Sequence, residues 1–99
     1  MEFEVTRKDG GITITVKGKL SAGNADEMQK AVEAAIAESN NIVIDLKDLV
    51  FIASAGLRVL VLAQKKLKAA QGKLAIRNVK SEIFEVFKIT GLHSILDIS

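Results

Sequence analysis

The chain has 99 residues, 48% of them hydrophobic and 26% charged, and a formal net charge of +2, which suits one compact core. It has no cysteine and one histidine, which excludes disulfides, thiolate metal sites and clusters of imidazole ligands. No apolar run approaches the roughly 20 residues of a membrane span, and neither Tyr nor Trp is present to stack on nucleic-acid bases. We expect one cytoplasmic domain, residues 1–99, without membrane insertion or nucleic-acid binding.

The N-terminal residues predict a β-hairpin. Apolar and polar residues alternate over 3–6 and again over 12–16, which is the period of a strand with one buried face. Between them, Lys8-Asp9-Gly10-Gly11 contains the Asp-Gly pair that is typical of a tight hairpin turn. Residues 18–23 have the composition of a loop.

Three later segments predict helices. Asn24 precedes Glu27 by three residues, which favours a capping box at the start of a helix that closes near 39–41. A second helix over 57–70 is expected to end at Gln71-Gly72 with a glycine cap. Ser81 is expected to cap a third helix that Gly91 closes.

The remaining apolar segments predict strands. Ile42–Leu46 is short, β-branched and apolar on both faces, which favours a central strand buried on two sides. Residues 74–76 and 95–98 predict two more strands, and helical crossovers between strands imply parallel neighbours. We expect an α/β fold, a mixed sheet of about five strands with three main helices in the order ββαβαβαβ.

Ser54 is the first candidate functional residue, because it lies where the chain after the central strand enters the second helix. A group there is close to free backbone N–H donors and the positive end of the helix dipole, which favour a phosphoryl group. Serine is also a preferred N-cap, so a purely structural role is the simpler alternative. Gly56 weakens the helix and Arg58 opposes its dipole, and both favour close approach by a phosphate or a partner.

Four segments together carry a family resemblance. They are Val16-Lys17-Gly18-Lys19-Leu20, Val43-Ile44-Asp45-Leu46, Ser54-Ala55-Gly56-Leu57-Arg58-Val59-Leu60 and Thr90-Gly91-Leu92. In this order they resemble the STAS domains of bacterial anti-sigma-factor antagonists, over nearly the whole chain. The resemblance implies a STAS-like fold in which Ser54 is the phosphorylated serine.

The resemblance further implies a partner-switching regulator that is not an enzyme and needs no cofactor. The unmodified protein would bind an anti-sigma factor that is also a serine protein kinase, phosphorylation of Ser54 would release it, and a metal-dependent serine phosphatase would reset the switch. The residues expected at the contact surface are Ala53, Ser54, Ala55, Gly56, Leu57, Arg58, Val59, Leu62 and Ser21.

Two features leave alternatives open. Val59 and Leu62 lie off the inward stripe of the second helix, and either form an apolar patch beside Ser54 or are covered by a neighbouring helix. Ser21 and Ala53 replace polar residues that many members of the family carry, which favours a STAS module that serves, without phosphorylation, as a subunit of a transporter or stress-sensing complex.

No residue is expected to act as a catalytic group or a metal ligand. His93 is far from Ser54 in the sequence and is more typical of a polar surface turn than of a catalytic pair. Asp9 is expected in a turn, Asp45 at the end of a strand and Asp48 in solvent.

Overall fold

The computed structural model describes residues 1–99 and contains five strands, three α-helices and one 3-10 turn. In chain order these are β1 (Glu2–Lys8), β2 (Gly11–Leu20), α1 (Ala25–Glu38), β3 (Asn41–Ile52), α2 (Ser54–Ala69), β4 (Lys73–Arg77), α3 (Ser81–Ile89), η1 (Leu92–Ser94) and β5 (Asp97–Ile98). The strands form one sheet in the order β1-β2-β3-β4-β5, in which only β1 is antiparallel to its neighbour. The predicted α/β class, mixed sheet and element order are confirmed.

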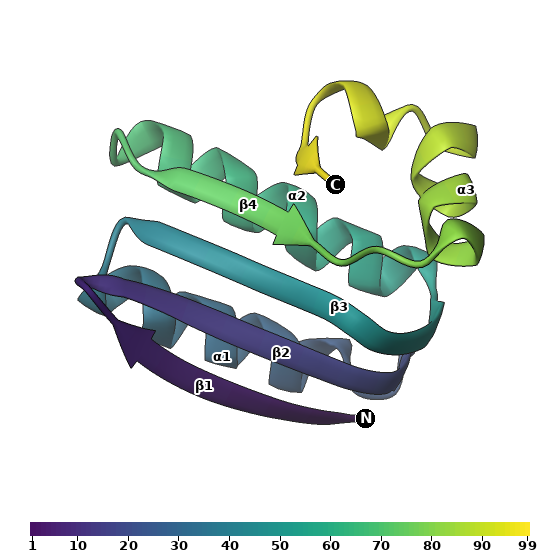
Figure 1. The fold of residues 1–99 in the computed structure, drawn as a ribbon, viewed down its shortest axis with the longest axis horizontal. Coiled ribbons are helices and arrows are strands. Elements are labelled where there is room, and N and C mark those ends of the chain that lie inside the picture. The colour runs from purple at the N-terminus through teal and green to yellow at the C-terminus, as the bar shows by residue number, and fades with distance from the viewer.

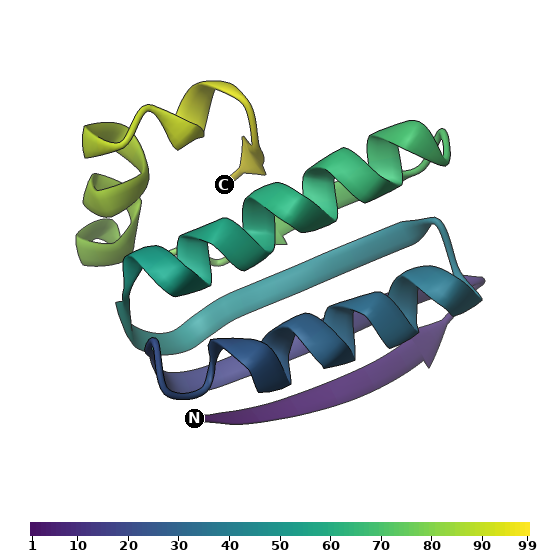
Figure 2. The same ribbon diagram turned by 180° about the vertical axis from the view of Figure 1, so that it is seen from behind.

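Helices α1 and α2 lie on the same face of the sheet, and α3 lies beyond the end of β4 (Figures 1 and 2). The core is one cluster of 23 buried apolar residues contributed by β2, β3, β4, all three α-helices and Leu96, and no polar side chain is fully buried. On β3, Val43 and Asp45 point to the opposite face and are only partly buried. The prediction of a central strand buried on two sides is therefore wrong, because the long helices cover one face only.

No helix combines the length and the apolar character that a membrane crossing requires.

The predicted hairpin forms with the predicted turn. Asp9 and Gly10 have φ angles of 52° and 79°, the left-handed pair that a two-residue type I′ turn needs. Lys8 and Gly11 close the turn as the last pair of the β1–β2 register. Strand β2 then extends to Leu20, so the first residues of the loop predicted at 18–23 belong to the sheet.

Strand β3 is six residues longer than predicted at its C-terminal end because it contains two β-bulges. Its register with β2 shifts between Thr15 and Lys17 and again between Gly18 and Lys19, each time with one extra residue on β3. At the first bulge the displaced N–H of Lys47 donates to the Asp45 carboxylate at 3.0 Å. Bulges bend a strand and redirect side chains, and this strand leads directly into α2.

The helix starts differ from the predicted caps. Asn24 is the N-cap residue of α1 but makes no capping hydrogen bond, so the predicted capping box with Glu27 does not form. Its side chain instead accepts the Ser21 N–H at 2.8 Å and donates to the Lys19 carbonyl at 2.9 Å, which closes the loop after β2. Helix α3 begins one residue earlier than expected, with Lys80 at the cap position and Ser81, the predicted cap, as the first helical residue.

Helix α2 ends in a Schellman motif whose left-handed residue is Gln71, with φ of 58°. The Gly72 N–H donates to the Leu67 carbonyl at 2.6 Å, and the Gln71 N–H to the Lys68 carbonyl at 3.1 Å. The expected glycine cap is therefore displaced by one residue. Gly72 is required for a different reason, since a Cβ at this position would lie only 2.7 Å from the Asn40 Cβ.

Surface ion pairs connect elements that are distant in sequence. Arg7 of β1 forms a bidentate ion pair with Glu38 of α1, with N–O distances of 2.6 and 2.7 Å. Lys66 of α2 forms an ion pair with Glu33 of α1 at 2.9 Å. Hydrogen bonds from these cations are the main cause that lowers the pKa of each carboxylate below its ordinary value. A third pair, Arg77 with Asp97 at 3.0 Å, joins β4 to β5 and lowers the Asp97 pKa in the same way.

We expect these pairs to make stability depend weakly on pH in the acid range. A carboxylate with a lowered pKa in the folded state stabilises the fold above its unfolded pKa, about 4.3 for Glu, and loses that contribution as the pH falls through the folded pKa. In Glu38→Gln, the free energy of unfolding measured with urea should fall less steeply between neutral and acidic pH than in the unmodified protein. Asp48→Asn should leave this pH dependence unchanged, because Asp48 is exposed and forms no ion pair. The expected effect is small, since the pairs are exposed. Equal curves for Glu38→Gln and the unmodified protein would contradict the expectation.

Candidate functional site

The candidate site is the N-terminus of α2, where the sheet delivers Ser54. Strand β3 ends at Ile52, Ala53 follows in extended conformation, and Ser54 is the first residue of the helix. The Ala53 N–H donates to the Leu20 carbonyl at 2.8 Å, so the last residue of β2 fixes the backbone immediately before Ser54. The loop after β2, with Ser21, therefore adjoins the start of α2.

The side chain of Ser54 is exposed and does not cap the helix. The cap position belongs to Ala53, which has no side-chain oxygen, so the interpretation of Ser54 as an N-cap is wrong. The N–H groups of Gly56 and Leu57 both donate to the Ala53 carbonyl. The N–H groups of Ser54 and Ala55 precede the first helical hydrogen bond and form part of the positive end of the helix dipole.

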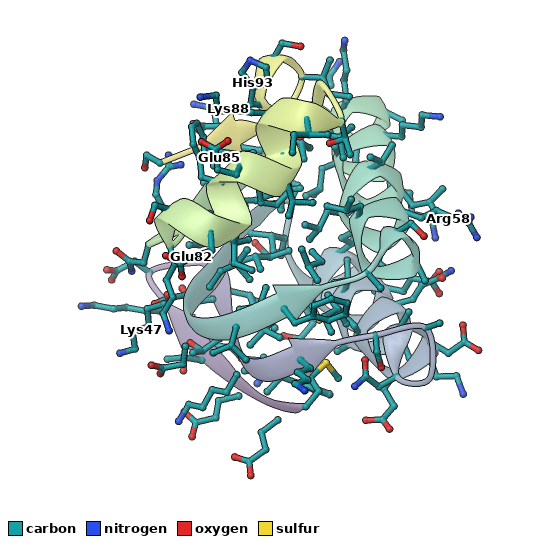
Figure 3. The ribbon with its side chains drawn as sticks, turned by 90° about the vertical axis from the view of Figure 1, so that its right-hand side faces the viewer. Lys47, Arg58, Glu82, Glu85, Lys88 and His93 are labelled. Atoms are coloured by element: carbon teal, nitrogen blue, oxygen red, sulfur yellow. The ribbon has the colours of Figure 1, made fainter.

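The charge around Ser54 favours an anion. The first turn of α2 contains no acidic residue, and Arg58, four residues after Ser54, lies one turn away on the same side of the helix. Arg58 is exposed and forms no ion pair within the chain. Figure 3 shows it projecting from α2 away from Glu82 and Glu85 of α3. A phosphoryl group on Ser54 would meet no competing carboxylate from its own helix turn.

Gly56 is explained by packing inside the protein. A Cβ on Gly56 would lie 2.7 Å from the Cγ of Leu20 and 3.1 Å from the Cγ1 of Ile52, both buried in the core. The need for close approach inferred from the sequence is real, but the approaching groups belong to β2 and β3. Gly56 lets the first turn of α2 lie directly on the ends of these strands.

The remaining residues expected at the contact surface divide between surface and core. Leu57 and Val59 are 7% and 3% exposed and pack in the core, so Val59 cannot contribute to an exposed patch. The buried face of α2 is wider than a single stripe because both the sheet and other elements pack on it. Leu62, with Ser21, Ala53 and Ala55, is partly buried.

Val50 and Phe51 were not among the predicted contact residues, but they are 57% and 47% exposed and precede Ser54 by four and three residues. The second bulge places both outside the core, between buried Leu49 and Ile52. The signal that could have identified them is the spacing of apolar residues: Leu46, Leu49 and Ile52 recur every three residues. The end of β3 thus contributes exposed apolar side chains three and four positions before Ser54.

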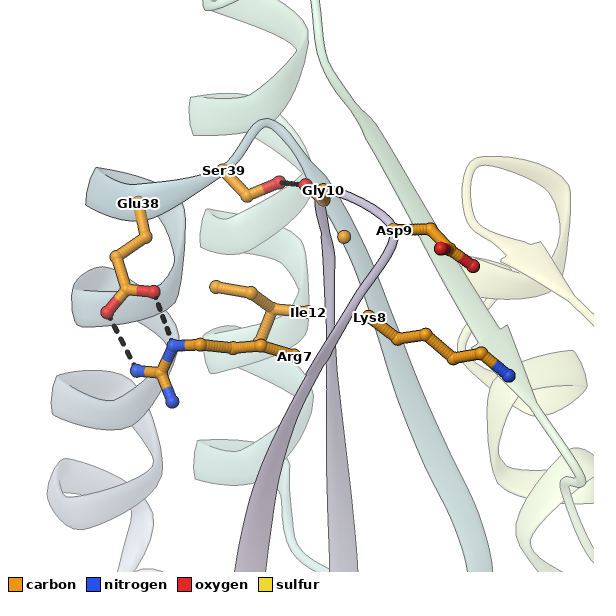
Figure 4. A pocket seen from close by; sticks show the side chains of 8 residues that line it. Arg7, Lys8, Asp9, Gly10, Ile12, Glu38 and Ser39 are labelled. Atoms are coloured by element: carbon orange, nitrogen blue, oxygen red, sulfur yellow. Dashed lines mark hydrogen bonds and ion pairs between the residues drawn. The ribbon is translucent and has the colours of Figure 1, made fainter.

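Other parts of the surface do not bring together residues typical of a catalytic or metal-binding site. A polar hollow of about 310 Å³ lies between the hairpin turn and the end of α1, at the opposite end of β2 from the Ser54 loop. Its wall contains the Arg7–Glu38 pair and the hydrogen bond from Ser39 to the Gly10 carbonyl at 2.7 Å (Figure 4). No group of three or more His, Asp or Glu side chains is placed to bind a metal ion. His93 is exposed in η1.

The sequence profile of the STAS domain matches residues 2–99. The chain belongs to the STAS domain family. This STAS domain is 32% identical over 99% of its length to the anti-sigma-B factor antagonist of Listeria monocytogenes, covering 88% of that protein. It is 28% identical over 100% of its length to the anti-sigma-B factor antagonist of Bacillus subtilis, covering 91% of it.

Solved structures share the fold of this STAS domain. The anti-sigma factor antagonist SpoIIAA in its unphosphorylated form superposes with a TM-score of 0.85 and 19% sequence identity, covering 99% of this chain and 88% of SpoIIAA. The Bacillus protein in its phosphorylated form gives a TM-score of 0.79, with 99% and 91% coverage. The same chain fold therefore occurs in a protein solved both with and without phosphorylation.

Proposed function

We propose that this protein is an anti-sigma factor antagonist that acts by partner switching in the cytoplasm, with Ser54 as its phosphorylated residue. In the unmodified state it binds an anti-sigma factor that is also a serine kinase and thereby frees the sigma factor. Phosphorylation of Ser54 breaks the contact, and a metal-dependent serine phosphatase restores it. The names of the relatives support the antagonist role.

The observation that carries the assignment of Ser54 is its exposed hydroxyl on the first residue of α2, free of a capping role. Phosphorylation adds about −1.5 to −2 charges at neutral pH. The helix N-terminus favours that charge, and Arg58 is close enough in the helix to pair with it. The fold therefore tolerates the phosphoryl group, while a partner surface complementary to a neutral serine does not.

The test is phosphorylation by serine kinases of the histidine-kinase-like ATPase superfamily from the source organism, with Mg-ATP and intact mass as the readout. We expect one added phosphoryl group in the unmodified protein and none in Ser54→Ala. Ser81→Ala is the matched control, because Ser81 is also exposed and is also the first residue of a helix. It should be phosphorylated like the unmodified protein.

The affinity of the two forms for the kinase completes the test. Phosphorylated protein should bind the kinase at least tenfold more weakly than unmodified protein, since a charge buried at an interface without a partner is unfavourable. If the protein binds a kinase stably but is never phosphorylated, the result would instead support the alternative of a STAS module that serves as a constitutive subunit of a larger complex. A phosphoryl group that persists in Ser54→Ala would contradict the assignment of the residue.

A further inference from the structure

Strand β1 forms one edge of the sheet and pairs only with β2. Its seven residues therefore present a row of N–H and C=O groups that have no partner in the sheet. Figures 1 and 2 show that neither α1 nor α2 crosses this edge. No proline and no bulge interrupts β1, so the edge is open to pairing with another strand.

The charges of β1 are arranged so that the strand complements itself when reversed. Acidic Glu2 and Glu4 occupy its first half, and basic Arg7 and Lys8 its last two positions. When two copies pair in antiparallel directions, Glu2 at the start of each strand can face Lys8 at the end of the other, whereas Arg7 points toward α1 and is paired with Glu38. Opposite charges facing each other across strands stabilise a pair.

Hydrogen-bond geometry limits this pairing to a few registers. Directly opposed residues in an antiparallel pair direct their backbone groups either both toward or both away from each other. A two-fold axis must therefore pass through one residue of β1. An axis at Glu4 opposes the two Glu4 side chains, and an axis at Thr6 leaves Glu2 and Phe3 unpaired. An axis at Val5 pairs all seven residues and places Glu2 opposite Lys8 of the second copy.

The face of β1 that points toward α1 supplies apolar surface for the same contact. Phe3 and Val5 line an open groove of about 390 Å³ with alanines of α1. Val5 is 38% exposed, and with the axis at Val5 it would meet its own copy. Phe3 would oppose Arg7 of the second copy, whose guanidinium is already paired with Glu38 of its own chain.

We propose that two copies of this protein associate through antiparallel pairing of their β1 strands about Val5, which joins two five-stranded sheets into one. The two-fold axis directs the β3 strands of the two copies in opposite directions. The Ser54 sites therefore lie at opposite ends of the joined sheet, and both stay accessible. The association does not depend on the function proposed for Ser54.

A charge-swap series measured by sedimentation equilibrium tests the pairing. One strand pair is a small interface of the weak, transient kind, so the protein should be studied up to about 1 mM. Glu2→Lys and Lys8→Glu each convert two attractive pairs into repulsive ones, and each should raise the dissociation constant about tenfold. The double variant carrying both changes should regain the affinity of the unmodified protein. A protein that stays monomeric at the highest concentration, or a double variant as weak as the single ones, would overturn the proposal.

Single cysteines test the register, because the chain has no cysteine of its own. Opposed Cα atoms in antiparallel strands lie about 4.5–5.5 Å apart, which suits a disulfide. With copper phenanthroline as oxidant, Val5→Cys should form disulfide-linked dimers much faster than Glu4→Cys or Thr6→Cys, whose Cα atoms would lie about 7–8 Å from their own copies. Faster linkage of either of those two variants would overturn the register.

Discussion

Gly72→Ala is expected to lower the free energy of unfolding by about 2 kcal/mol, because the added methyl group would overlap the backbone where β3 and β4 begin. A Cβ there would lie 2.7 Å from the Asn40 Cβ and 3.0 Å from the Asn40 carbonyl carbon. The Asn40 carbonyl also accepts the Lys73 N–H at 2.7 Å, next to the Asn41–Lys73 pair of the parallel ladder. The overlap can be relieved only by moving the first residues of both strands. Urea unfolding followed by circular dichroism measures the loss.

Gly23→Ala is the matched control for this substitution. Gly23 is exposed, its φ angle is not in the left-handed region, and a Cβ there would meet only the Ser21 hydroxyl at 3.8 Å. We expect this variant to differ from the unmodified protein by less than about 0.5 kcal/mol. Equal stability of the two alanine variants would show that the approach of Gly72 to Asn40 is unimportant.

Phe51→Ala is expected to weaken binding of the unphosphorylated protein to its anti-sigma factor about 30-fold, or about 2 kcal/mol. This expectation rests on the proposed function. Phe51 precedes Ser54 by three positions, so their Cα atoms are at most about 11 Å apart, and a partner that contacts the serine can also cover the ring. Aromatic side chains that become fully buried at an interface commonly dominate its affinity.

Isothermal titration calorimetry with the purified anti-sigma factor measures the effect of Phe51→Ala. Ile95→Ala is the control, because Ile95 is 56% exposed but follows η1 near β5, two strands away from β3. Both substitutions remove exposed apolar atoms and should change folding stability little. Equal affinities of the two variants would exclude Phe51 as an anchor of the interface.

The sequence predicted the order of elements because most of them have regular apolar periods. The failure at β3 has a clear physical cause. The two bulges change the spacing of its buried residues from two at Ile42, Ile44 and Leu46 to three at Leu49 and Ile52. A rule based on strict alternation therefore ends the strand at Leu46, although its pairing with β2 continues to Ile52.

The sequence predicted where in the chain the site lies, but not the local backbone and packing around it. Ser54 was correctly predicted at the entry to the second helix, but that helix was expected over 57–70 and begins at Ser54 itself. Whether a residue is the cap or the first helical residue depends on one backbone position, which sequence patterns do not resolve. Val59 was misplaced because the width of a buried helix face depends on how many elements pack on it. The reason for Gly56 was also hidden, since its contacts Leu20 and Ile52 end two different strands.

Two contacts with Leu20 fix the backbone around Ser54: the Ala53 N–H donates to the Leu20 carbonyl, and Gly56 packs against the Leu20 side chain. They affect how an enzyme would recognise Ser54. A disordered acceptor loop loses conformational entropy when an enzyme binds it, but the backbone before Ser54 is already immobilised by the neighbouring strand. An enzyme that modifies Ser54 must accept this preformed shape, to which two segments more than 30 residues apart contribute. The residues flanking the serine, taken as a linear peptide, do not carry that shape, so an enzyme that depends on it would not recognise the unfolded chain.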